Sequence, residues 1–246
     1  MTDGRLRWSG EGPALVLIHG WAAGPEVFRS WLPRLESRWR VGTVTLPGHG
    51  ECADGVLNPA AIARFVAGRL TKPAVWLGWS LGAQVALQAA RYHGSAVRAV
   101  VALSATPRFC PAHDWSWGVP RARLRAMRRG LDADVAEVVV RFADATLGVQ
   151  GPLSGHGIEA LRSGLECLER NDLRTLLPEI QSPLLWLAGD RDPLVSVEAL
   201  RAAASLTPGA QSRVLGGAGH APFLTHAPAI EEAIDTWTEG TGEGHE

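Results

Sequence analysis

A glycine–serine–glycine pattern between two regular segments constrains this chain more than any other part of its sequence. Gly78, Ser80 and Gly82 alternate with tryptophan and leucine. The apolar run 73–77 before them is typical of a buried strand, and the segment 83–91 after them has helical patterning. A serine on a sharp strand-to-helix turn needs small residues two positions to either side, because the backbones there pass too close for a Cβ atom. The pattern predicts that Ser80 is a nucleophile, and the competing interpretation is a plain glycine-rich turn.

The segments around this turn predict an α/β fold. Further short segments, most of them apolar and each expected to be a strand, lie at 14–18, 41–46, 97–103, 183–188 and 211–215. Helical patterns separate most of these runs, including one amphipathic helix expected over 25–38, so we expect a mostly parallel, doubly wound sheet. Between 106 and 176 there is only helical and loop patterning. We therefore expect a helical cap over 106–176, inserted into a sheet domain formed by 1–105 and 177–246.

Two more polar residues follow predicted strands and are suited to activate a serine. Ser80, Asp192 and His220 occur in the chain order of an α/β-hydrolase triad, and parallel strands bring such positions to one edge of a sheet. Imidazole serves as the base because its pKa lies near neutral pH, and the carboxylate orients it. Asp190 is the alternative acid, although we expect it to cap its loop. The backbone N–H groups of Trp21 and Leu81 are the expected oxyanion donors.

The remaining histidines have less specific interpretations. His19 and His49 lie in glycine-flanked loops and are expected to support loop geometry, and His226 is expected to pack or cap behind the turn that holds His220. The others have no motif around them and are expected in solvent: His93, His113, His156 and His245. No pair of histidines has helical ligand spacing and no Cys/His cluster occurs, so we expect no metal site.

The motifs together resemble those of the pimeloyl-[acyl-carrier-protein] methyl ester carboxylesterases of biotin synthesis, the BioH family. The similarity covers nearly the whole chain. It rests on His19-Gly-Trp21, the tryptophan-flanked turn 76–82, Phe109-Cys with Asp114-Trp115, Arg141-Phe142, Gly164-Leu-Glu with Asp172-Leu-Arg174, and His220-Ala-Pro-Phe with His226. The resemblance implies an α/β-hydrolase fold with Ser80, Asp192 and His220 as the triad, and with Trp21 and Leu81 framing the oxyanion hole.

The resemblance also implies a substrate and a partner. The family hydrolyses the methyl ester of a pimeloyl chain carried on acyl-carrier protein. The substrate-binding residues would then be Trp21, Ser80, Leu81, His220 and the acyl-pocket residues Phe142, Ala143, Asp144, Ala145 and Thr146. Because the carrier is acidic, a basic cap face should attract it. Candidate docking residues are Arg121, Arg125, Arg128, Arg129 and Arg141. The alternative is a solvated helix face, and the segment 149–157 lacks the basic residues that a docking cap would carry.

Composition and charge argue against several other classes of function. The net charge of −1 gives no general attraction to nucleic acid or to an anionic membrane, and no run reaches transmembrane length. Three scattered cysteines and an N-terminus without an apolar region favour a cytoplasmic protein. We expect a monomer without a cofactor. Alternatives to the carrier esterase are a general short-acyl esterase, a carbon–carbon-bond hydrolase and a non-catalytic receptor on the same scaffold.

Overall fold

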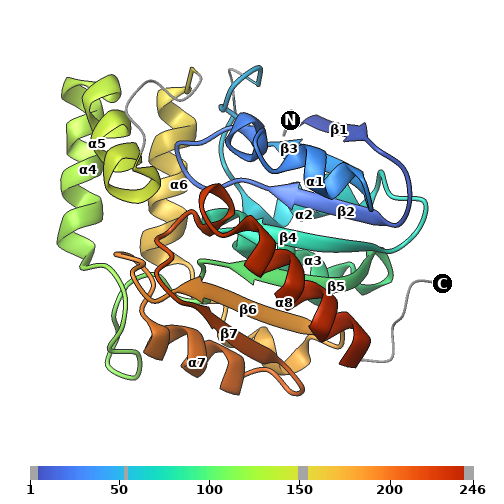
Figure 1. Ribbon diagram of the computed structural model, residues 1–246. Coiled ribbons are helices and arrows are strands. Elements are labelled where there is room, and N and C mark those ends of the chain that lie inside the picture. The colour runs from blue at the N-terminus through green and yellow to red at the C-terminus, as the bar shows by residue number, and fades with distance from the viewer. Residues whose placement is uncertain (1–4, 53–54, 149–154, 241–246) are drawn as a thin grey trace.

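A seven-stranded sheet forms the centre of the protein (Figure 1). The computed structural model describes residues 5–52, 55–148 and 155–240. The strand order is β1-β3-β2-β4-β5-β6-β7, and β1 (Arg5–Ser9) is antiparallel to β3 while every other neighbouring pair is parallel. The other strands are β2 (Ala14–Ile18), β3 (Arg40–Thr45), β4 (Ala74–Trp79), β5 (Val97–Leu103), β6 (Leu184–Gly189) and β7 (Gln211–Leu215). The expected mostly parallel α/β fold is confirmed.

Alternating side chains divide the core into two halves, one on each face of the sheet. In β4, Trp76 packs into one apolar cluster, while Leu77 and Trp79 pack into the other. The first face is covered by α2 (Pro59–Ala67), α3 (Leu81–Tyr92) and α7 (Val197–Ser205). The second face is covered by α1 (Leu32–Glu36) and α8 (Ala227–Gly240). Four short 3₁₀ helices complete the connections: η1 (Pro25–Phe28), η2 (Gly94–Ala96), η3 (Leu177–Glu179) and η4 (Pro222–Leu224).

The expectation of a single helix over 25–38 is wrong. The chain forms η1 and then the five-residue α1, separated by a turn. Pro33 explains the break, because proline has no N–H to donate and its ring excludes the preceding turn from a continuous helix. Proline therefore stands near the start of α1 rather than inside a longer helix.

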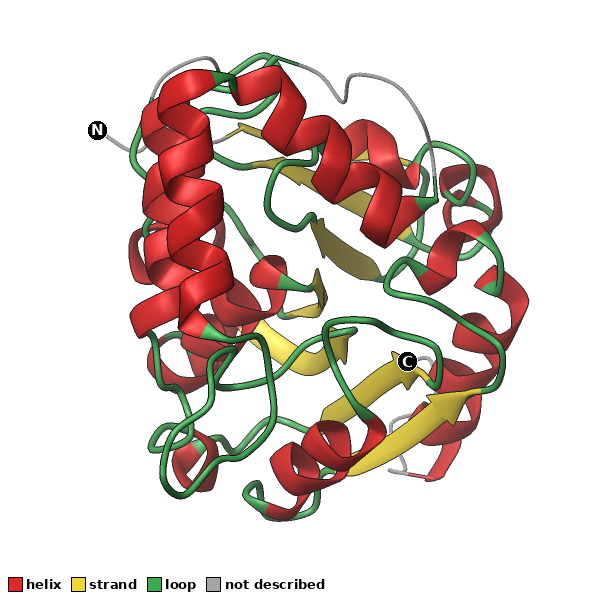
Figure 2. Cartoon of the chain, turned by 90° about the vertical axis from the view of Figure 1, so that its left-hand side faces the viewer, coloured by secondary structure: helices red, strands yellow, loops and turns green. Residues whose placement is uncertain are grey.

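Among the described residues, three α-helices lie between β5 and β6 in the chain and together form what we call the helical insertion. They are α4 (Arg121–Ala133), α5 (Val135–Leu147) and α6 (Ile158–Arg170). Figure 1 shows them side by side beyond one end of the sheet, and Figure 2 views the molecule from their side. None of the described helices is long and apolar enough to span a bilayer.

Ionic contacts tie the start of the insertion to its end. The Arg174 guanidinium donates to Asp172 at 2.7 Å and lies 3.0 Å from an Asp114 carboxylate oxygen, and Arg108 contacts Asp172 at 2.5 Å. The Leu173 N–H also donates to the Pro107 carbonyl oxygen at 2.9 Å. Hydrogen bonds from Arg174 help lower the pKa of Asp172 to about 2. We refer to this group of residues as the neck.

Candidate active site

Ser80 lies on a strained turn between β4 and α3. Its backbone has φ 54° and ψ −120°, an unusual conformation for a residue with a side chain. The flanking glycines permit the turn, because a Cβ on Gly78 would lie 2.4 Å from the Ala83 Cα and one on Gly82 would lie 2.3 Å from the Ile18 carbonyl oxygen. The turn places the serine hydroxyl beyond the end of β4 and at the N-terminus of α3.

The hydroxyl of Ser80 begins an unbroken line of hydrogen bonds. Ser80 Oγ lies 3.0 Å from His220 Nε2, and His220 Nδ1 lies 2.9 Å from Asp192 Oδ2. The His220 and Asp192 side chains are almost completely buried, at 1% and 0% exposure. Asp192 Oδ1 also accepts from the backbone N–H groups of Leu194 at 2.8 Å and Val195 at 3.1 Å. The structure thus brings together the three residues that the sequence selected from three separate strand ends.

Asp190 has a different environment. It is exposed, and its Oδ1 accepts from the Gly217 N–H at 2.7 Å, in the loop that leads to His220. This contact agrees with the expected loop-capping role. Sequence reasoning missed a second support of His220, the indole of Trp79, which donates to the His220 carbonyl oxygen at 2.7 Å. The only signal for it was a large aromatic residue directly before the nucleophile.

His19 orients the loop that follows β2. Its Nδ1 donates to the Gly20 carbonyl oxygen at 2.9 Å, and its Nε2 accepts from the Leu46 N–H at 3.1 Å. With both ring nitrogens used in this way the ring is neutral, and burial lowers the pKa of His19 to about 4. A Cβ on Gly20 would lie 3.1 Å from the Ser80 Cβ, so this loop runs directly beside the serine.

The expectation that His156 lies in solvent is wrong. Its ring packs against His49 at a centroid distance of 5.2 Å, and His49 packs against His19 at 5.3 Å. The Gly50 N–H donates to the Gly155 carbonyl oxygen at 3.0 Å and thereby brings the start of α6 onto this loop. Burial lowers the pKa of His156, and it lowers the pKa of His49 to about 3. Within the described ranges no three His, Cys, Asp or Glu side chains form a group able to hold a metal ion.

The remaining histidines outside the triad have other environments where they are described. His113 is exposed and His93 is partly exposed. His226 pairs through its ring with the Thr225 hydroxyl at 2.7 Å and directly precedes α8, which agrees with the expected capping or packing role. His245 lies outside the described residues.

The two expected oxyanion donors lie close to the serine, one directly after it in the chain and one in the loop that runs beside it. Leu81 is the first residue of α3, where a backbone N–H has no acceptor within the helix. Trp21 lies in the loop after β2, and its side chain is 1% exposed beneath the insertion. Its indole Nε1 donates to the Leu161 carbonyl oxygen in α6 at 2.8 Å, and its ring meets the Phe142 ring edge-on at 4.8 Å.

The five residues expected to line an acyl pocket do not share one face of α5. Phe142 is partly buried against Trp21, and Ala143 and Thr146 are buried. Asp144 and Ala145 are exposed, because successive helical residues are rotated by about 100°. Only Phe142, Ala143 and Thr146 therefore lie on the inner side of this helix.

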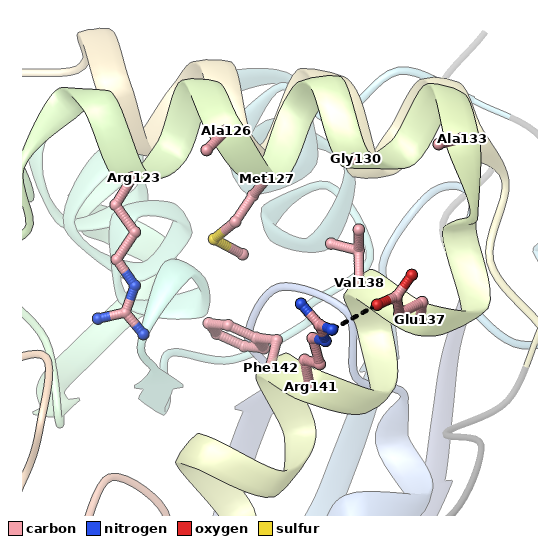
Figure 3. A pocket seen from close by; sticks show the side chains of 9 residues that line it. All are labelled: Arg123, Ala126, Met127, Gly130, Ala133, Glu137, Val138, Arg141 and Phe142. Atoms are coloured by element: carbon pink, nitrogen blue, oxygen red, sulfur yellow. Dashed lines mark ion pairs between the residues drawn. The ribbon is translucent and has the colours of Figure 1, made fainter.

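A groove of about 330 Å³ lies between α4 and α5 (Figure 3). Met127, Val138 and Phe142 give it an apolar wall. Arg123 and Arg141 flank the opening, and Arg141 pairs with Glu137 at 2.6 Å while its side chain remains 79% exposed.

The arginines expected to dock a carrier protein fall into two groups. Arg121, Arg125 and Arg128 turn toward Glu169 of α6. Arg121 donates to its carbonyl oxygen at 2.8 Å, and the other two contact its carboxylate at 2.8 and 3.4 Å. The hydrogen bond from Arg125 is the main cause that lowers the pKa of Glu169, and the charges of the three arginines lower it further. Arg129 and Arg141 are exposed, and Arg125 also remains 56% exposed beside Glu169. The residues 149–154, which lack basic side chains, lie outside the described ranges.

Comparison with known proteins supports the resemblance inferred from the motifs. Residues 15–233 match the alpha/beta hydrolase family. The chain is 42% identical over 241 residues to the pimeloyl-[acyl-carrier protein] methyl ester esterase of Xanthomonas oryzae, covering 92% of this chain and 94% of that protein. A protein of the same name from Stenotrophomonas maltophilia is 40% identical over 247 residues, covering 92% and 93%.

Among solved structures, an esterase from Exiguobacterium antarcticum has a TM-score of 0.88 at 22% identity and covers 97% of this chain and 96% of its own. That similarity bears on the fold alone. The sequence matches and the fold agree, and the chain belongs to the alpha/beta hydrolase family and, within it, to the family of the pimeloyl-[acyl-carrier protein] methyl ester esterases.

Proposed function

We propose that this chain is a serine carboxylesterase that hydrolyses the methyl ester of pimeloyl-acyl-carrier protein. The observation that carries the proposal is the line of hydrogen bonds from Ser80 through His220 to the buried Asp192. Ester hydrolysis needs a nucleophile, a base within reach of its proton, and donors for the oxyanion. The names of the relatives supply the substrate.

The proposed reaction has two halves. Ser80 Oγ attacks the ester carbonyl carbon while His220 Nε2 takes the hydroxyl proton, and Asp192 stabilises the resulting imidazolium. The N–H groups of Leu81 and Trp21 hold the oxyanion of the tetrahedral intermediate. Collapse releases methanol, which takes the proton from His220 and leaves an acyl-enzyme. Water then attacks the acyl carbonyl with His220 again as base, which frees the carboxylate and restores the serine.

In this proposal residues 106–176 act as a cap over a hydrolase core formed by 1–105 and 177–246. Phe142, Ala143 and Thr146 are the cap residues best placed beside the acyl chain, since Phe142 contacts Trp21 in the loop after β2, which runs beside Ser80. For carrier docking we favour the surface of α4 and α5 around the groove of Figure 3, where Arg123, Arg129 and Arg141 face solvent. Arg121, Arg125 and Arg128 then serve mainly to join α4 to α6 through Glu169.

The test compares substrates and labels the serine. We expect pimeloyl-carrier methyl ester to be turned over with a higher kcat/KM than a nitrophenyl ester of a short acyl chain. Equal or lower efficiency on the carrier substrate would contradict the substrate assignment and favour a general esterase. Wild-type protein should react covalently with a fluorophosphonate, and Ser80→Ala should not. An unlabelled wild type would favour a non-catalytic receptor.

A further inference from the structure

The side chain of Trp21 connects the loop after β2, which runs beside Ser80, to the helical insertion. The indole crosses from the end of β2 to α6, where its N–H donates to the Leu161 carbonyl oxygen at 2.8 Å. It lies directly against the α6 backbone, because a Cβ on Gly164 would come within 2.5 Å of the Trp21 Cδ1 atom. Phe142 of α5 meets the same ring edge-on. Two helices of the insertion therefore fix the position of this one residue.

The peptide bond before Trp21 is held from the other direction. Its carbonyl oxygen belongs to Gly20 and accepts from His19 Nδ1, whose other ring nitrogen accepts from the Leu46 N–H. A peptide unit is planar, so the direction of its carbonyl group fixes the direction of its N–H group. The N–H of this unit is the Trp21 donor of the proposed oxyanion hole. Its orientation thus depends on a strand-side contact at His19 and on an insertion-side contact at Leu161.

We propose that the helical insertion positions the oxyanion donor through the Trp21 indole, which acts as a latch between α6 and the loop after β2. The inference rests on the proposed function, because it assigns a role in stabilising the oxyanion. A displacement of α6 carries the indole and turns the Trp21 N–H away from the reacting carbonyl. The insertion is then part of the catalytic apparatus as well as a cover for the acyl chain, and Leu161 and Gly164 are positioning residues.

The indole hydrogen bond contributes to orientation more than to stability. Leu161 lies in the first turns of α6, so its carbonyl oxygen can also accept the i+4 bond of the helix. Removing the indole N–H therefore leaves no buried carbonyl without a donor. A change in rate without a comparable loss of stability is the expected signature of the latch.

The chain offers matched variants for the test. Trp21→Phe removes the indole N–H and keeps an aromatic ring. Gly164→Ala disturbs the same contact from the α6 side, and it replaces a helical glycine by the residue with the highest helix propensity. Trp76→Phe is the control, because the Trp76 indole is also fully buried and also donates to a backbone carbonyl, that of Ala96 at 3.0 Å.

The assay uses a short activated ester, so that carrier binding does not enter, and a trifluoromethyl ketone, which forms an oxyanion on the serine. We expect kcat to fall about tenfold or more in Trp21→Phe and Gly164→Ala with KM changed less than about threefold, since loss of a whole oxyanion donor costs about 10²–10³. The inhibition constant of the ketone should rise by the same factor. Trp76→Phe should stay within about twofold of wild type in both measurements.

The inference is overturned if Trp21→Phe and Gly164→Ala keep kcat and the ketone inhibition constant within about twofold of wild type. Equal losses in Trp76→Phe would also overturn it, because the effect would then be one of general stability. A wild type that hydrolyses no ester and takes no fluorophosphonate would instead refute the proposed function, and the latch with it.

Discussion

Replacing Asp192 by asparagine tests the proposed roles of all three residues, because the structure fixes which way the new amide must point. Asp192 Oδ1 accepts from the backbone N–H groups of Leu194 and Val195, so the asparagine oxygen has to remain there. The NH₂ group then takes the place of Oδ2, 2.9 Å from His220 Nδ1. The NH₂ group cannot accept from Nδ1, and the asparagine oxygen, 3.0 Å from Nδ1, already accepts from two backbone N–H groups, so we expect His220 to carry its proton on Nε2. That nitrogen then donates to Ser80 Oγ and can no longer accept the serine proton.

The expected loss follows from this change of tautomer. An aspartate-to-asparagine replacement in a chymotrypsin-type triad lowers kcat by about 10⁴, which corresponds to about 5.5 kcal/mol of activation free energy. We expect a loss of that order in Asp192→Asn, measured by stopped-flow hydrolysis of a nitrophenyl ester. The melting temperature should change little, because the backbone contacts of Oδ1 are retained.

Asp190→Asn is the matched control. Its Oδ1 contact with the Gly217 N–H survives the replacement, so we expect activity close to that of wild type. If Asp192→Asn kept kcat within tenfold of wild type, or if Asp190→Asn were the more damaging variant, the assignment of the acid would be refuted.

Three further predictions concern the turn, the histidine cluster and the neck. Gly78→Ala should destabilise the protein by more than about 3 kcal/mol in urea unfolding, since its Cβ would lie 2.4 Å from Ala83 Cα, whereas Gly94→Ala, with open space around it, should change stability by less than about 0.5 kcal/mol. Because burial lowers the pKa of His19 from 6.5 to about 4, the unfolded chain binds more protons between these values. The free energy of unfolding should therefore decrease as the pH is lowered from 6.5 to 4, by up to about 1.4 kcal/mol per pH unit from this residue. His19→Asn should show a shallower decrease over the same range in urea titrations. Arg174→Met removes the contacts with Asp114 and Asp172 and should speed amide exchange in segments 107–115 and 171–174 by about tenfold; unchanged exchange there would contradict the role given to the neck.

Periodicity alone predicted most of the sheet. The strands β2 and β5 have the limits expected from their apolar runs, because buried parallel strands read as continuous hydrophobic segments. The edge strand β7 also has the expected limits, although it is polar and only partly buried. The edge strand β1 was not expected. It alternates exposed arginines with the partly buried Leu6 and Trp8, and such a short run is difficult to distinguish from a loop without its partner β3.

The site was predictable where a backbone constraint leaves a mark in the sequence. The glycines around Ser80 mark the turn, and the strand ends mark the positions of Asp192 and His220. Contacts between distant side chains left no such mark. Three arginines spaced along α4 look the same whether they meet a carrier protein or Glu169, and the packing of His156 against His49 depends on a backbone pairing between two loops.

The neck also determines how freely the helical insertion can vary in length and sequence. Arg108 and Asp172 face each other across an antiparallel backbone bridge, so the chain enters and leaves the helical insertion at almost one point. Because this junction holds the two ends of the insertion together, residues beyond it can be inserted, deleted or exchanged without shifting the strands that carry the reacting groups. Chimaeras that swap the residues beyond this junction between homologues should keep the triad in place and change the acyl groups that they accept, provided that the α6 residues in contact with Trp21, Leu161 and Gly164, are retained.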